Sequence, residues 1–252
     1  MSLVRSELLR IRSRRMIRVL GITALMGSAV GLTIAAINSH PGGQLRLFAL
    51  PDILRGTSVI VFIIGLVIGG SSVGADWQHG TLAALLTWEP RRVRVFLTRA
   101  VVVMLSVFAL AVILQVAFSL MVAIATALRG DTGGTGGAWL RHVAGVTLRV
   151  GVASAFGATV GLTIAMIGRN TAAALGVAFG YLAVVESLMR GLMPKISSVL
   201  LSTNMAVFID GRAGTSETGS PISVGRASLT LTLYAGVLLI AALTLFRKRD
   251  VT

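Results

Sequence analysis

The sequence contains no cysteine, and only 9 of its 252 residues are acidic. The absence of cysteine excludes disulfides, thiol nucleophiles and thiolate metal sites. Charged residues make up 13% of the chain, whereas a soluble domain usually carries about 25%. Together with 55% hydrophobic residues and a mean hydropathy of +0.88, this composition argues against an ordinary water-soluble fold.

Lysine is also scarce, because only Lys195 and Lys248 accompany the arginines among the 23 basic residues. A phosphate-binding P-loop needs Gly-Lys followed by Ser or Thr, but these lysines stand in Pro-Lys-Ile and Arg-Lys-Arg. The chain therefore lacks that ATP site. It also lacks an HExxH motif and an acid pair within any apolar run. We expect a protein that is not an enzyme and that carries no metal or cofactor of its own.

Long charge-free runs are abundant, and they predict membrane spans. An ionised side chain at the bilayer centre costs at least ~2.5–3.5 kcal/mol, and ~20 apolar residues suffice to cross the hydrocarbon. Backbone hydrogen bonding in lipid favours helices for such runs. We predict an all-α integral membrane protein, one transmembrane domain over residues 1–252, with six helices at about 17–37, 56–75, 100–127, 146–167, 171–189 and 227–246.

The basic residues are shared unevenly between the two sides of these spans. With the N-terminus inside, 14 lysines and arginines lie on the inner side and nine on the outer side, and the net charges are +10 and +4. Cytoplasmic loops carry the excess of such residues, so both termini are expected in the cytoplasm. The dominance of arginine over lysine is typical of a GC-rich bacterial genome, which places this multi-pass protein in a bacterial plasma membrane. A nucleic-acid partner is excluded, because the charge is spread over loops that flank spans.

The outer segment 190–226 contains an apolar stretch at 196–209. Runs of about 10–14 residues are too short to span a bilayer, so we predict a short re-entrant or surface helix, with an ordered loop as the alternative. Residues 211–225, rich in Gly and Ser, are expected to be mobile. The inner connection Gly168-Arg169-Asn170 is expected to be a tight turn.

Few polar side chains lie within the spans. Gln115 either forms a hydrogen bond across helices or faces a transport pathway. Glu186 and Arg149, near outer span ends, are expected to extend to the membrane interface. Glycine pairs four residues apart predict a tightly packed helical bundle, with packing inside one chain favoured over a dimer contact; they are Gly27/Gly31, Gly65/Gly69, Gly70/Gly74, Gly157/Gly161 and Gly176/Gly180.

The inner loop 76–99 has the pattern of two short amphipathic helices. Leu82, Leu85 and Leu86 share one helical face, and Pro90 suits the first turn of the second helix. The apolar face of that second helix holds Val93, Phe96 and Leu97. Such a pair can lie on anionic lipid headgroups or bind a soluble partner.

This loop resembles the ABC-2 type permease family. The shared pattern is an acidic residue ending a span, Gly-Thr-Leu, paired leucines, Pro-x-Arg and a basic residue opening the next span. The matching positions are Gly80, Thr81, Leu82, Leu85, Leu86, Pro90, Arg92, Phe96, Leu97 and Arg99. Asp76 stands where the family usually has Glu, and Arg99 where Lys is commoner. The amphipathic segment 1–16 and the basic-Asp-Val ending at 247–251 are similar to the interface helix and the C-terminus of that family.

The resemblance implies the permease subunit of an ATP-driven exporter. It would work with a second permease chain, identical or sister, and with separate ATPase subunits that bind ATP and Mg²⁺. The implied ATPase-coupling residues are Asp76, Gly80, Thr81, Leu82, Leu85, Leu86, Pro90, Arg91 and Arg92, with Leu8, Ile11, Arg12 and Arg15 on the N-terminal interface helix. The substrate class would be hydrophobic or amphipathic.

The alternative function is an ion-coupled secondary transporter or a small channel without ATPase partners. Such proteins typically carry an ionisable residue near the membrane midplane or Gly/Pro-broken helices in repeated halves. Those features are absent or weak in the sequence.

Overall fold

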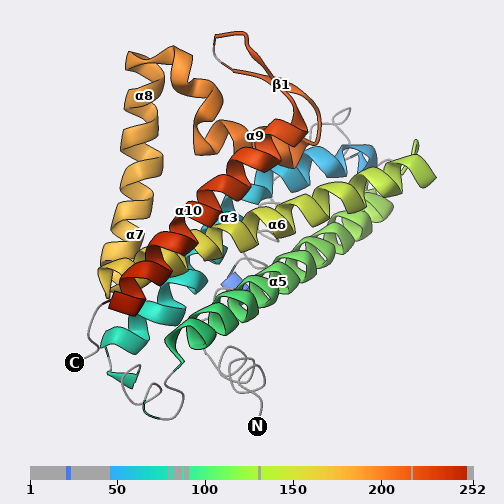
Figure 1. The fold of residues 1–252 in the computed structure, drawn as a ribbon. Helices are drawn as coiled ribbons and strands as arrows, with labels where there is room; N and C mark the ends of the chain where they lie inside the picture. Colours follow the sequence, from blue (N-terminus) through green and yellow to red (C-terminus); the bar gives the residue numbers. More distant parts are fainter. Residues whose placement is uncertain are drawn as a thin grey trace.

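The computed structural model describes residues 21–23, 46–78, 80–81, 87, 91–129, 132–216 and 218–248. Five of its helical segments are long and apolar enough to cross a membrane (Figure 1): Leu47–Gln78, Arg92–Leu128, Gly137–Gly168, Thr171–Leu192 and Val224–Lys248. They correspond to the second to sixth predicted spans, so the helical architecture is confirmed for them. The first predicted span, apart from 21–23, and the segment 1–16 lie outside the described residues.

The long helices extend past the predicted spans at both ends. They are α3 (Leu50–Gln78), α5 (Arg92–Arg129), α6 (Gly137–Gly168) and α10 (Val224–Lys248). A charge-free run marks the part of a helix suited to hydrocarbon, whereas the backbone hydrogen bonds continue into charged residues beyond it. The first turn of α3 holds Pro51 and Asp52, which are favoured there because proline lacks an N–H and an acid complements the helix dipole.

The fifth predicted span is composite. It consists of α7 (Thr171–Gly180), the π-helix η2 (Tyr181–Val185) and α8 (Glu186–Leu192). The expected tight turn before it is confirmed, with Arg169 in the left-handed region at φ 54° and Asn170 as the N-cap of α7. The Asn170 side chain accepts hydrogen bonds from the amides of Ala172 and Ala173 at 2.8 and 3.4 Å.

Helix α6 is the central helix, because 83% of its most apolar 18-residue stretch is buried inside the bundle. Helices α3, α5, α7, α9 and α10 all contact it. Its contact with α3 is a close backbone approach: a Cβ added at Gly161 would overlap the Leu66 carbonyl oxygen, and one at Gly69 would overlap the Ala158 carbonyl oxygen. The predicted pairs Gly65/Gly69 and Gly157/Gly161 therefore pack within one chain.

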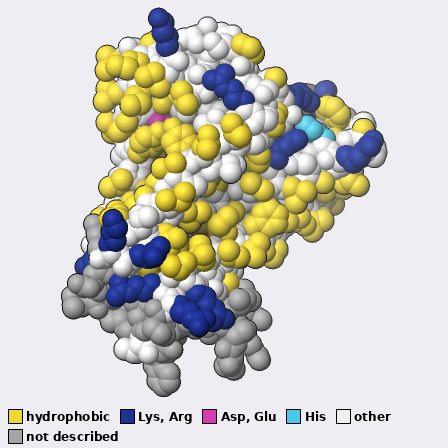
Figure 2. Space-filling view, in the orientation of Figure 1, with side chains coloured by type: hydrophobic (Ala, Val, Ile, Leu, Met, Phe, Trp, Pro, Cys, Tyr) yellow, Lys and Arg dark blue, Asp and Glu magenta, His cyan; other side chains and the backbone are white. Residues whose placement is uncertain are grey.

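Two helical segments lie mainly on the outside of the bundle: Thr171–Leu192, which comprises α7, η2 and α8, and Val224–Lys248. In each of them, only 17% of the most apolar 18-residue stretch is buried. Figure 2 shows broad hydrophobic areas over these helices. Their exposed large apolar side chains include Val177, Val184, Leu188, Leu233, Val237 and Ile240. This is the surface expected of helices that face lipid or another apolar protein surface.

The segment between α8 and α10 is a folded cap. It runs through the 3-10 helix η3 (Pro194–Val199), α9 (Leu201–Asp210) and a hairpin of β1 (Gly214–Thr215) with β2 (Pro221–Ile222). The predicted short helix is thus confirmed, and α9 packs against α10, α6 and α3. The expectation that 211–225 is mobile is wrong for the hairpin, because antiparallel pairing orders it and Ile222 is fully buried beside Val207 and Ala227.

Because α3 and α6 approach so closely, we predict that a larger side chain at their contact destabilises the protein. Replacing Gly161 with Val should destabilise the protein by about 1–3 kcal/mol or more, because the added side chain forces two backbones apart. The matched control is Gly145→Val on the same helix, where an added Cβ meets nothing within 4 Å. Thermal unfolding in detergent, followed by circular dichroism, measures both; equal unfolding temperatures for the two variants would contradict the prediction.

Candidate functional site

We call the end of the bundle at which α3 ends and α5 begins the lower end, as drawn in Figure 1, and the opposite end the upper end. At the lower end, four parts of the chain converge: the end of α3, the start of α5, the α6–α7 turn and the end of α10. Seven side chains join them and form the lower-end cluster. They are Asp76, Trp77, Arg92, Phe96, Arg99, Arg169 and Phe246.

An ion pair lies at the centre of the lower-end cluster. Nη1 of Arg99 on α5 is 2.7 Å from Oδ2 of Asp76 on α3, and the side chains are 2% and 5% exposed. Removing one partner from such a buried pair leaves an uncompensated charge, which typically costs about 3–5 kcal/mol. The Asp76 carboxylate therefore ties α3 to α5 and is not available to an external partner.

Aromatic rings connect this pair to the end of α10. Phe246 meets Trp77 edge-on, with ring centroids 6.5 Å apart, and lies 6.3 Å from Phe96. The Arg169 guanidinium of the α6–α7 turn lies over the Trp77 ring at 4.6 Å, a cation–π contact. Nη1 of Arg92 donates to the Phe246 carbonyl at 3.5 Å. The four helix ends are thus joined as one packed unit.

The structure places part of the predicted coupling loop. Gly80 ends the α3 region with φ 66°, and its amide donates to the Trp77 carbonyl at 3.3 Å. The Thr81 hydroxyl donates to the Asp76 carbonyl at 3.4 Å. The remaining predicted residues Leu82, Leu85, Leu86 and Pro90, and Leu8, Ile11, Arg12 and Arg15 of the N-terminal segment, lie outside the described residues.

The second amphipathic helix of the loop is not separate but is the first turns of α5. No glycine or proline interrupts the sequence between 92 and 129, so the helix continues without a break. Of its expected apolar face, Phe96 is buried at 1% exposure, while Val93 and Leu97 remain exposed.

A basic groove lies beside the lower-end cluster. Its volume is about 770 Å³, and it is lined by Arg91, Arg92, Val93, Arg94, Leu97, Thr98 and Arg247. Figure 2 shows arginine and lysine side chains gathered at this end. Four guanidinium groups around one groove favour binding of an acidic surface.

Gln115 forms hydrogen bonds across helices, which is one of the two roles that the sequence allowed for it. The side chain is 1% exposed. Its amide oxygen accepts from the Thr57 hydroxyl at 3.1 Å, and its Nε2 donates to the Leu54 carbonyl at 3.3 Å. Both partners are on α3, so Gln115 joins α5 to α3.

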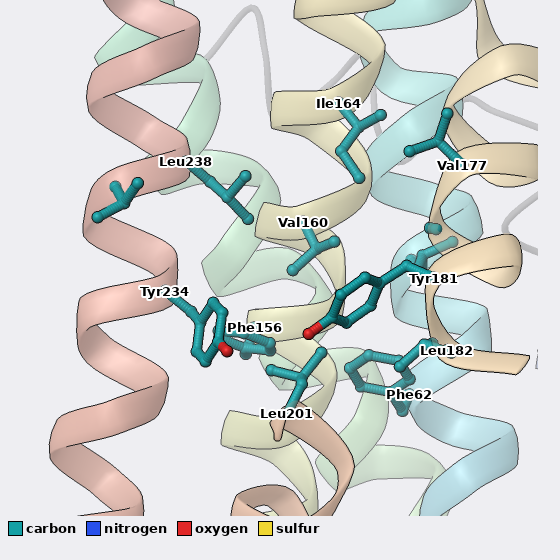
Figure 3. A pocket seen from close by; sticks show the side chains of 13 residues that line it. Phe62, Phe156, Val160, Ile164, Val177, Tyr181, Leu182, Leu201, Tyr234 and Leu238 are labelled. Carbon is teal, nitrogen blue, oxygen red and sulfur yellow. The ribbon is translucent and has the colours of Figure 1, made fainter. Parts of the chain in front are cut away.

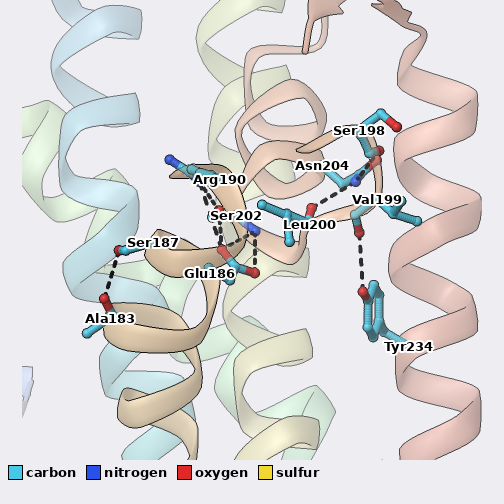
Figure 4. A network of polar contacts seen from close by, with 10 residues as sticks. All are labelled: Ala183, Glu186, Ser187, Arg190, Ser198, Val199, Leu200, Ser202, Asn204 and Tyr234. Carbon is cyan, nitrogen blue, oxygen red and sulfur yellow. Dashed lines mark hydrogen bonds and ion pairs between the residues drawn. The ribbon is translucent and has the colours of Figure 1, made fainter. Parts of the chain in front are cut away.

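Glu186 does not extend to an interface, as the sequence suggested, but is buried at 2% exposure (Figure 4). Its carboxylate accepts from the Ser202 amide at 3.2 and 3.3 Å and from the Ser202 hydroxyl. Arg190 donates to that hydroxyl and lies 3.9 Å from the carboxylate. Ser202 is in the first turn of α9, so an acid of α8 caps another helix. Carboxylates stabilise a helix N-terminus because the free amides and the dipole are positive there.

The C-terminus of α9 has the opposite charge beside it. Gly211 follows α9 with φ 66°, and the Arg149 guanidinium of α6 occupies the space that a Gly211 side chain would fill. Asp210 is paired with Arg55 of α3 at 3.3 Å, and Arg55 also contacts Asp52 and His142. Arg149, which the sequence predicted to extend to the membrane interface, is half-buried, and its guanidinium lies against the C-terminus of α9.

Sequence reasoning missed the roles of Glu186 and Arg149, because each depends on how the chain reverses between α8 and α10. The available signals were an acid inside an apolar run and Arg190 one turn after it. Among the residues that the structure describes, no group of three or more His, Asp or Glu side chains is placed to hold a metal ion.

The described residues form a mostly helical protein in which five helical segments are long and apolar enough to span a membrane, the composition of a multi-pass membrane protein. The chain belongs to the family described as protein of unknown function (DUF2705), which it matches over residues 29–252. No curated protein matches it.

Because the lower-end ion pair is buried, we predict that removing one of its partners destabilises the protein. Asp76→Leu should lower the free energy of unfolding by about 3–5 kcal/mol, because the buried Arg99 guanidinium loses the carboxylate with which it is paired. The double variant Asp76→Leu/Arg99→Met should recover most of that loss. The control Asp52→Asn removes a largely exposed partner of Arg55 and should cost at most about 1 kcal/mol. Thermal unfolding of the four proteins gives the comparison, and a double variant no more stable than Asp76→Leu would show that the pair is not the cause.

Because Glu186 caps α9, we predict that its removal weakens the N-terminus of that helix. Glu186→Ala should weaken the first turn of α9 by about 0.5–2 kcal/mol, the range for loss of a helix N-cap. Hydrogen exchange followed by mass spectrometry should show faster exchange in α9 and unchanged exchange in α5. The control Ser187→Ala alters the next residue of α8, whose hydroxyl bonds to the Ala183 carbonyl within the same segment. Equal exchange of α9 in both variants would rule out the capping role.

Proposed function

We propose that this chain is the permease subunit of an ABC-2 type, ATP-driven exporter. The observation that carries the proposal is the lower end, where a buried ion pair and packed aromatic rings join four helix ends beside a basic groove. The sequence resemblance assigns ATPase coupling to this same stretch of the chain. ATP and Mg²⁺ would be bound by separate ATPase subunits, and hydrolysis would take place there.

The packing of the lower end suits the transmission of a movement. A force applied at Arg91 reaches α5 directly, because α5 begins at the next residue. From α5 it reaches α3 through Arg99 and Asp76, and α10 through Phe96 and Phe246. Protein interiors are close-packed and transmit strain, so these helices would move together rather than bend separately.

The proposed arrangement in the membrane follows from charge. The lower end is assigned to the cytoplasm, with both termini, because the inner segments carry the excess of basic residues. Coupling contacts would include Gly80, Thr81 and Arg92, together with Leu82 and Leu85 of the loop. The poorly buried apolar surface of the bundle leaves area for a second permease chain and for lipid. A hydrophobic or amphipathic substrate would move outward along the permease interface.

One observation favours the alternative of an ion-coupled carrier without ATPase partners. Glu186 is a buried acid in a helix long enough to span a membrane, and such residues often mark ion pathways. Its carboxylate, however, is occupied by the α9 N-terminus and Arg190, which gives it a structural role. The exporter is the better-supported function.

Co-purification tests the exporter function and is the fourth prediction. The chain, purified in mild detergent, should carry a P-loop ATPase subunit, recognised by mass spectrometry and by ATP hydrolysis. Charge reversal in the basic groove, Arg91→Glu with Arg247→Glu, should remove most of that subunit, because it places acids where an acidic surface docks. The loop variant Leu82→Asp with Leu85→Asp should do the same.

The matched control reverses two arginines at the upper end, Arg141→Glu with Arg226→Glu, and should leave co-purification unchanged. Recovery of the wild-type chain alone would contradict the exporter function. If that chain also moved protons across reconstituted vesicles, and Glu186→Gln abolished the movement, the ion-coupled carrier would replace it.

A further inference from the structure

A cavity of about 390 Å³ lies between α10 on one side and α7 with η2 on the other (Figure 3). Its floor is formed by Phe62 of α3 and by Phe156, Val160 and Ile164 of α6. Leu201, at the start of α9, lines the end of the cavity nearest the upper end of the bundle, which is drawn at the bottom of Figure 3. The cavity exists because α7 and α10 both rest on α6 while leaving a space between them.

The lining is almost entirely hydrocarbon and aromatic ring. Its two polar side chains are Tyr181 and Tyr234, and the Tyr234 hydroxyl donates to the Val199 carbonyl at 3.2 Å. Tyr181 enters from η2, and its hydroxyl points across the cavity towards the side of Tyr234 (Figure 3). Apolar cavities of this kind stay dry and take up apolar molecules, so water is a poor occupant.

The cavity is reached from the side of the bundle. Val177 on α7 and Val237 on α10 belong to its lining and are still 60% and 65% exposed. Both residues belong to helices that are long and apolar enough to span a membrane. The opening between them therefore faces the medium that surrounds the spans, which for such helices is hydrocarbon.

The length of the cavity fits one leaflet. Phe156 and Ile164 are eight residues apart on α6, which corresponds to about 12 Å along the helix axis. Half of the ~30 Å hydrocarbon thickness is about 15 Å. A linear alkyl chain entering from one leaflet would lie along α6 for most of its length.

We propose that this cavity binds one acyl chain of a phospholipid from the surrounding bilayer. The acyl chain lies on Phe156, Val160 and Ile164 and fills the space between α7 and α10. The site goes beyond the proposed export function and belongs to this chain alone, so it stands or falls independently of ATPase docking.

Photo-crosslinking tests the site and is the fifth prediction. The full chain is reconstituted without partners into phosphatidylcholine vesicles that contain a small fraction of phosphatidylcholine with a diazirine on the acyl chain. After irradiation, mass spectrometry should find lipid adducts on lining residues such as Tyr181 and Leu238, above the level on the exposed α5 residues Ile113 and Leu120. After transfer to detergent, native mass spectrometry should find one retained phospholipid per chain.

A variant that fills the cavity separates bound lipid from general contact. Val160→Trp should lower the adducts on Tyr181 and Leu238 at least about tenfold and remove the retained phospholipid, because an indole occupies the space of the acyl chain. Val152→Trp, on the same helix but 47% exposed and outside the cavity lining, should change neither. If Val160→Trp does not fold, Ala178→Leu, which fills the cavity from α7, takes its place and should likewise lower the adducts on Tyr181 and Leu238 and remove the retained phospholipid.

Other results would overturn the site. Adducts on lining residues no more frequent than on Ile113, or equal labelling of wild type and the folded filling variant, would show that no acyl chain is held there. Crosslinks from a lining residue to a second copy of the chain, or to residues 17–37, would show that protein occupies the cavity instead.

Discussion

The close contact between the backbones of α3 and α6 determines where the other helices lie. In lipid, the hydrophobic effect does not drive helices together, so association depends on close packing of small residues. Gly69 and Gly161 allow each backbone to approach a carbonyl of the other helix. With α3 set against α6 in this way, α5, α7 and α10 pack on the remaining surface of α6. The apolar cavity is a consequence, because α7 and α10 reach α6 at separate positions and leave a space over its surface between Phe156 and Ile164.

Charged side chains are scarce, so the position of each one inside the bundle is informative. The buried Asp76 is paired with the buried Arg99 at the lower end, and the buried Glu186 and the half-buried Arg149 stand at opposite ends of α9. An acid at the N-terminus and a base at the C-terminus both oppose the partial charges of the helix dipole. Helix α9 is therefore held by two different long helical segments, and its position at the upper end depends on α8 and α6 keeping their relative positions. Movement of either segment would therefore displace the cap that η3, α9 and the β1–β2 hairpin form.

Much of this architecture was predictable from the sequence. Charge-free runs predicted five of the described helical segments, and the Gly168-Arg169-Asn170 turn and a short helix within the stretch 196–209, observed at 201–210, followed from run lengths. Helix ends were not predictable in this way, because Arg55 is accommodated inside α3 by contacts with Asp52, His142 and Asp210. Glycine spacing predicted tight packing but not the partner helix. The pairing of Glu186 with Ser202 requires the reversal through η3, which no local pattern encodes.

The lower end illustrates how burial changes the interpretation of a motif. Asp76 and Arg99 are the first and last residues of the inner loop that the resemblance assigns to ATPase coupling, yet each is too deeply buried to contact another protein. Such a pair contributes little net stability compared with an apolar pair of the same volume, although its loss is costly. Under the proposed function, its value is to join α3 and α5 at a fixed register. Recognition would then fall to the exposed Arg91 and Arg247 in the basic groove, which places docking and transmission in different side chains of the same end of the bundle.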